Sequence, residues 1–238
     1  TLIQEFGFQA EAWGDFGITA AGVSYSVPGG ETKEFPLVKE TAPDERVTFK
    51  QLLALEELEV KPDELISWHL WADDFASDGK PRRTVSDIYF AEVRPFEEIF
   101  RPGQGQQGGQ PQGGGGMGGA AEEQAGNQKQ IICATWNIKR TEDVNSGPPK
   151  PSEKYIKDLP VVRDAQAEAL KKAEVLRERA EDPRSQAFVE DITKEMKNAL
   201  ERIDEAAKSP DALDAALSAE QAAYNALLKL AAHEFRVQ

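Results

Sequence analysis

A tract rich in glycine and glutamine divides the chain into two parts of different character. Residues 101–120 hold ten of the 19 glycines, together with five glutamines and two prolines. Such a composition buries too little apolar surface to offset the conformational entropy that ordering would cost. We therefore predict a flexible linker over residues 101–127, with a separately folded part on each side of it.

Charge and cysteine content narrow the range of partners. Residues 1–100 carry 20 acidic and nine basic side chains, residues 101–238 carry 22 and 19, and the net charge is −14. A surface of this sign repels phosphate backbones, so we expect no nucleic-acid partner. The single cysteine, Cys133, excludes an intrachain disulfide and any zinc site built from several cysteines.

Short strands are predicted for residues 1–100. In two stretches, apolar and polar residues alternate with the period of two that is typical of half-buried strands. The apolar residues are Val23, Tyr25 and Val27 in the first stretch and Ile66, Trp68 and Leu70 in the second. About six such strands, separated by turn residues, predict an acidic immunoglobulin-like β-sandwich. Residues 52–60 are rich in leucine and glutamate and fit either a strand or a short helix.

Helices are predicted for the second half, which makes the chain an α+β multidomain protein. We expect a short amphipathic helix at residues 128–143, a proline-rich linker at residues 144–157 and about three helices over residues 158–238. Asp182-Pro183 and Ser209-Pro210 are typical helix starts, in which a capping side chain precedes proline. Turns this short make the helices antiparallel neighbours, as in a helical bundle or hairpin. We expect one face of the middle helix to be buried through Phe188, Ile192, Met196, Leu200 and Ile203.

An acidic stretch between two predicted strands is the best candidate for a ligand site. Asp73, Asp74 and Asp78 lie close together in a predicted loop, and three carboxylates with a glycine can wrap calcium. The spacing departs from that of an EF-hand, because the twelfth position counted from Asp74 is Val85. A solvated hairpin loop is the more common use of such a sequence. If the ring of Trp71 is exposed, it could stack on a sugar, and the ligand could then be a glycan. The alternative is that the ring is buried in a second packed layer of the sheet.

The chain offers little for catalysis. His69 and His233 lie in different predicted parts, and neither has a second histidine or an acid at a metal-binding spacing. The Gly-x-Ser-x-Gly nucleophile motif is absent, and the glycine tract does not end in the Gly-Lys-Ser/Thr of a phosphate-binding loop. We therefore expect no enzyme activity and no bound cofactor.

Several segments carry a resemblance to one protein family. They are residues 86–101 at the end of the last predicted strand, residues 128–136 after the glycine tract, and residues 219–230 near the C-terminus. In this order they resemble the middle region of large planctomycete-type bacterial envelope proteins, a domain-of-unknown-function family. The resemblance implies membrane helices N-terminal to this sequence and a location in the bacterial cell envelope on the extracytoplasmic side. It implies no site residues.

Two functions are compatible with these features. The first is a non-catalytic structural or protein-interaction segment of a larger bacterial envelope protein, with protein partners or self-association through the helices. The second is an extracytoplasmic ligand-binding module, in which Asp73, Asp74 and Asp78 hold calcium or a glycan on the sandwich. In both, membrane anchoring depends on flanking segments outside this sequence.

Overall fold

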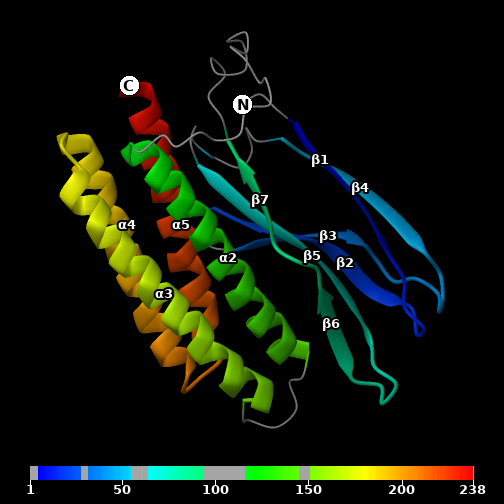
Figure 1. Ribbon diagram of the computed structural model, residues 1–238. Helices are drawn as coiled ribbons and strands as arrows, with labels where there is room; N and C mark the ends of the chain where they lie inside the picture. The colour runs from blue at the N-terminus through cyan, green and yellow to red at the C-terminus, as the bar shows by residue number, and fades with distance from the viewer. Residues whose placement is uncertain are drawn as a thin grey trace. The chain divides into compact units, whose positions relative to one another are not determined.

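Antiparallel strands precede helices along the chain, so the protein is α+β (Figure 1). The structure, a computed structural model, describes residues 5–27, 32–54, 60, 64–93, 116–144 and 151–237. The chain divides into two units, Thr1–Phe100 and Arg101–Gln238, which we call the sheet unit and the helical unit.

The sheet unit contains seven strands in its described residues. They are β1 (Glu5–Ala12), β2 (Ile18–Ser26), β3 (Lys33–Val38), β4 (Val47–Ala54), β5 (Leu65–Phe75), β6 (Pro81–Val85) and β7 (Tyr89–Glu92). β1 pairs with β4, and the other strands form a five-stranded sheet in the order β3-β2-β5-β6, with β7 also on β5. All of these pairings are antiparallel. About six strands were expected, and residues 55–59, part of the stretch left open between strand and helix, lie outside the described residues.

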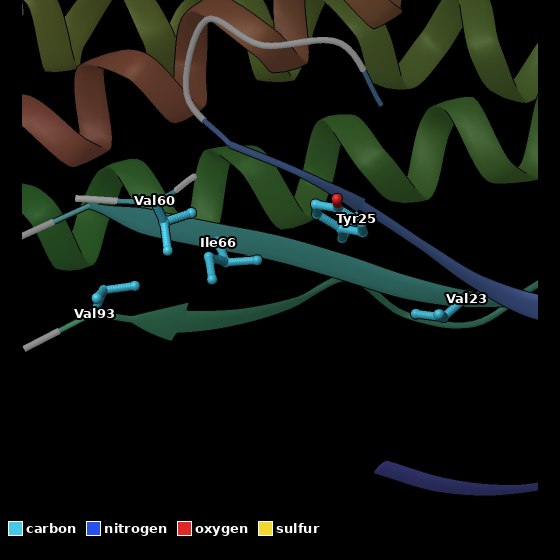
Figure 2. Close-up of a cluster of buried hydrophobic side chains, with 5 residues drawn as sticks. All are labelled: Val23, Tyr25, Val60, Ile66 and Val93. Carbon is cyan, nitrogen blue, oxygen red and sulfur yellow. The ribbon is translucent and has the colours of Figure 1, made fainter. Parts of the chain in front are cut away.

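Alternate residues of the central strands form a first apolar cluster. Figure 2 shows Val23 and Tyr25 of β2 gathered with Ile66 of β5, Val60 and Val93. The strand period of two explains why Val23 and Tyr25 both belong to this cluster, since residues two apart share one face of the sheet. Burying each of the larger aliphatic side chains stabilises the fold by roughly 2 kcal/mol.

A second apolar cluster joins the two sheets. Ile18, Ala21 and Val38 of the five-stranded sheet pack with Phe49 of β4. Leu37 lies against both clusters. The two-stranded sheet therefore contributes to the same core as the larger one.

Four helices make up the described part of the helical unit. They are α2 (Met117–Val144), α3 (Glu153–Arg179), α4 (Pro183–Ala206) and α5 (Ala212–Val237). Each helix packs against two others, in the order α2, α3, α4, α5 and back to α2. The fully buried interior includes Ile132, Ile192, Met196, Ile203, Leu213, Leu227 and Leu230. In the described residues, no helix combines the length and apolar character that crossing a bilayer requires.

Helix α2 begins at Met117, so the prediction of a linker as far as residue 127 is wrong for residues 117–127. Tertiary packing explains the difference. Gly118 lies so close to α5 that an added Cβ would stand 3.2 Å from the Cβ of Glu234. Ala121, one turn further on, is fully buried. Small residues allow this close approach, and the packing outweighs the low helix propensity of glycine.

Helix α3 begins at Glu153, five residues before the predicted start, so the expected linker at residues 144–157 ends earlier. Ser152 caps the helix, because its hydroxyl accepts a hydrogen bond from the backbone N–H of Tyr155 at 3.1 Å. Tyr155 is buried, and its hydroxyl donates to the carbonyl of Ala206 at 2.7 Å. Pro160 consequently lies inside the helix rather than at its first turn.

The buried face of α4 is displaced from the one we expected. Ile192, Met196 and Ile203 are buried as predicted, whereas Phe188 and Leu200 are only half-buried. Val189, which we did not expect, is fully buried, and so is Ala199, which the same helical spacing includes beside Leu200. Each is one residue away from a predicted position, which turns the stripe by about 100° at those points. The choice of an alanine over a leucine shows that close helix contact decides which residue faces inward here.

Candidate functional site

Strand β5 extends through the acidic stretch that we predicted as a loop. Asp73 and Asp74 are consecutive strand residues, so their side chains lie on opposite faces of the sheet. The turn itself follows Phe75, with Gly79 at a φ of +79°. The prediction that Asp73, Asp74 and Asp78 share one loop is therefore wrong, and strand geometry separates the first two carboxylates.

Each of these carboxylates pairs with a cation from the β5–β6 hairpin. Arg83 donates from Nε and Nη2 to the two oxygens of Asp73 at 2.7 and 2.8 Å. Arg82 likewise donates to both oxygens of Asp74, with its Nε 2.9 Å from Oδ1. These residues are cross-strand partners in the β5–β6 register, the arrangement in which opposite charges stabilise a sheet. The hydrogen bonds from its guanidinium to Asp73 raise the pKa of Arg83.

Asp78 pairs separately with Lys80. The ammonium of Lys80 lies 2.9 Å from Asp78 Oδ2, and its backbone N–H donates to Oδ1 at 3.2 Å. The hydrogen bonds from Lys80 lower the pKa of Asp78. In the part of the chain that the structure describes, no three metal-ligating side chains converge. A calcium ion would have to displace Arg82, Arg83 and Lys80 from their carboxylates.

Trp71 lies beneath one of these ion pairs and is buried, with 5% of its surface exposed. Its ring edge comes within 2.9 Å of the place where a Cβ on Gly22 would stand, and that Cβ would also meet the carbonyl oxygen of Phe35. The guanidinium of Arg83 covers the ring at 4.4 Å and also donates to Glu34 at 2.7 Å. The ring is therefore a packed layer and is not open for stacking on a sugar.

The two most exposed aromatic residues described in the sheet unit lie away from Trp71, at the bend between β1 and β2. Trp13 and Phe16 are 54% and 53% exposed. Arg46 lies over the Trp13 ring at 4.7 Å. Gly17 follows with a φ of +84°, and the carbonyl oxygen of Thr41 fills the place of its missing Cβ, so only glycine fits this bend.

A serine, a histidine and two acids meet where α4 begins and α5 ends. Ser185 donates to Glu234 Oε1 at 2.5 Å, while His233 Nε2 lies 3.4 Å from Asp182 Oδ1. Asp182 also caps α4 by accepting the backbone N–H groups of Arg184 and Ser185. Hydrogen bonding from Ser185, with smaller contributions from the backbone N–H of Arg184 and from His233, lowers the pKa of Asp182 to about 2. The serine hydroxyl donates to Glu234 and not to the histidine, so Ser185 and His233 do not form a nucleophile–base pair. The four residues instead connect the start of α4 to the end of α5.

Buried polar side chains run along the inside of the helical unit, which the sequence analysis missed. Gln124 donates to the carbonyl of Ala169 at 2.7 Å, and Gln128 pairs with Gln166 at 2.9 Å. Gln124 and Gln128 are one helical turn apart on α2, a spacing by which this row could have been found. These bonds satisfy polar groups that would otherwise cost stability in the interior.

Glu220 of α5 is the most deeply buried acid among the described residues. It has no exposed surface, and Thr135 of α2 donates to its Oε1 at 2.8 Å. Burial raises the pKa of Glu220 to about 8, against the smaller opposing effect of the Thr135 hydrogen bond. The side chain is therefore largely protonated at neutral pH.

A surface groove lies between α2 and α3 of the helical unit. Two adjoining hollows of about 400 and 180 Å³ share Gln124 and Lys172. We call them together the α2–α3 groove. The larger is lined by Gln124, Asn127, Gln130, Ile131, Ala134, Val161, Val162, Ala165, Glu168, Ala169 and Lys172. Along the groove, Val161 and Val175 are 67% and 48% exposed. These valines give the groove apolar surface that a partner could cover.

Comparison with known proteins identifies no family for this chain. No protein-family model matches it, and no curated protein sequence matches it. A solved structure titled pT26-6p is 12% identical and aligns over 97% of this chain and 49% of that one, so the chain spans about half of its length. The TM-score of 0.21 is too low to carry an argument about fold or function.

Proposed function

We propose that the chain is a non-catalytic structural or protein-interaction segment of a larger bacterial envelope protein, and that it takes a protein partner in the α2–α3 groove. The observation that carries this proposal is the groove with its exposed Val161 and Val175. The acids of the β5–β6 hairpin are neutralised by their own strand neighbours, which favours an interaction module over a ligand site. The envelope location rests on the sequence resemblance.

The sheet unit in this proposal is an immunoglobulin-like β-sandwich. The apolar cluster that joins Phe49 to Ile18, Ala21 and Val38 supports it, since the inner faces of two sheets share one core in a sandwich. Its role is that of a rigid spacer, held by the cross-strand pairs of Arg82 and Arg83.

A photo-crosslinking amino acid at Val161 tests the groove. The full-length protein carrying it would be irradiated in cells that make it, with a second version labelled at Glu190 as a control. Glu190 is exposed on α4 and lies outside the α2–α3 groove. We expect a covalent protein adduct, identified by mass spectrometry, from the Val161 label alone. Irradiation that gives no adduct at Val161, or equal adducts at both positions, would contradict the proposal.

A further inference from the structure

The wall that α3 contributes to the groove has a symmetric sequence pattern. In α3, Val162, Ala169 and Leu176 line the groove from buried positions, whereas the exposed lining residues are Val161, Ala165, Glu168, Lys172, Val175 and Arg179. Successive steps of four, three, four, three and four residues read the same in both directions, with a centre at position 170. Steps of three and four residues keep these side chains on one face of the helix, as in a seam between two packed helices.

We propose that the partner in the groove is α3 of a second copy of this chain, packed antiparallel about a two-fold axis at position 170. The inference rests on the proposed function and names its partner. In an isologous contact of this kind, each residue lies opposite the partner residue that is equally far from position 170 in the other direction. Position 168 then faces position 172, position 165 faces 175, and position 161 faces 179.

Charge complementarity favours this occupant. Glu168 would face the partner's Lys172, and the symmetry repeats the pair, so two ion pairs flank the axis. Both side chains are exposed in the single chain, where Glu168 reaches only Lys171 of its own helix, at 3.7 Å. Residues 101–238 hold 22 acidic and 19 basic side chains, so helical units of two copies repel each other little.

Apolar contacts surround the charged centre. Ala165 would meet the partner's Val175, which covers a valine that is 48% exposed in the single chain. Val161, 67% exposed, would lie against the aliphatic part of the partner's Arg179. The seam from residue 161 to residue 179 is about 27 Å long at 1.5 Å per residue. An interface of this size lies at the small end of specific contacts, so we expect a dimer in the micromolar range or weaker.

Charge exchange tests the pairing. Sedimentation of the full chain from about 10 μM to about 1 mM covers the affinity expected of such a contact. We expect wild type to dimerise. Glu168→Lys alone and Lys172→Glu alone should each weaken dimerisation at least tenfold, because either change places like charges opposite each other twice. The double variant, Glu168→Lys with Lys172→Glu, should restore it. As a control, Glu190→Lys with Lys194→Glu makes the same exchange on α4 and should change nothing.

Disulfide formation tests the register without relying on charge. Chains carrying Cys133→Ala with Ala165→Cys would be mixed with chains carrying Cys133→Ala with Val175→Cys. Mild oxidation should give the mixed disulfide. Neither chain alone should form one, because like positions would lie about 15 Å apart along the seam. Circular dichroism on each variant would confirm that it keeps its helices.

The outcomes separate this inference from the proposed function. A chain that stays monomeric over the whole concentration range, a double variant that does not recover, or disulfides between like positions would each overturn the self-pairing of α3. If the Val161 photo-adduct is then a different protein, the groove is still an interaction surface and only its partner is wrong. Absence of any adduct together with a monomeric chain would overturn both.

Discussion

Glu220 shows how one buried group can make the stability of the helical unit depend on pH. Its pKa is raised by burial from 4.5 to about 8 in the folded chain. Between these values the folded state holds a proton that the unfolded state has released. The contribution of Glu220 to the free energy of unfolding is therefore greatest below pH 4.5 and falls as the pH rises toward 8, by roughly 1 kcal/mol per pH unit.

We predict that Glu220→Gln removes most of this decline. The amide keeps a carbonyl oxygen that can accept from Thr135, and it cannot ionise. Urea unfolding of the full chain at several pH values, followed by circular dichroism, would measure the slope. Glu201→Gln, at an exposed position of α4, is the matched control and should leave the slope as in wild type. An equal slope in all three proteins would show that Glu220 is ionised in the fold.

At the scale of single elements, two of the three glycines of α2, Gly118 and Gly126, should respond differently to alanine. A Cβ on Gly126 would meet nothing within 4 Å, so Gly126→Ala should stabilise the helical unit by about 0.5–1 kcal/mol through higher helix propensity. A Cβ on Gly118 would stand 3.2 Å from the Cβ of Glu234, so Gly118→Ala should gain less or lose stability. Urea unfolding compares the two variants. Equal stabilisation by both would contradict the close approach of α2 to α5.

Helix beginnings show how far the sequence was informative. The start of α4 was predictable, because Asp182 and Pro183 act through bonds local to the chain. The start of α2 was not predictable, because it depends on the contact between Gly118 and Glu234, which are distant in sequence. Local pattern also located Val23 and Ile66 in the apolar core.

The candidate site was less predictable than the fold. Composition identified Asp73 and Asp74 as unusual, but only the register of β5 with β6 shows that Arg82 and Arg83 neutralise them. The α2–α3 groove depends on the spacing of two helices, and no sequence period reports that spacing. Glu220 was hidden for the same reason, since acids on helices are ordinarily exposed.

At the scale of the whole molecule, we predict that the two units unfold independently. Gly22→Ala should destabilise the sheet unit by about 1–3 kcal/mol, because the new Cβ meets the Trp71 ring and a β3 carbonyl. Hydrogen exchange with mass spectrometry would report each unit separately. The protection of α2 to α5 should not change. Gly7→Ala, where the added Cβ meets only the end of the Leu52 side chain, is the control. Loss of protection in both units would show that they are coupled.

The antiparallel order of the helices fixes how the helical unit would respond to tension. Gly118 of α2 lies beside Glu234 of α5, so the first turn of one helix and the last turns of the other are at the same end. A pull applied through these two ends acts across the contact between α2 and α5 and opens it one turn at a time. Peeling of this kind needs less force than sliding two helices past each other.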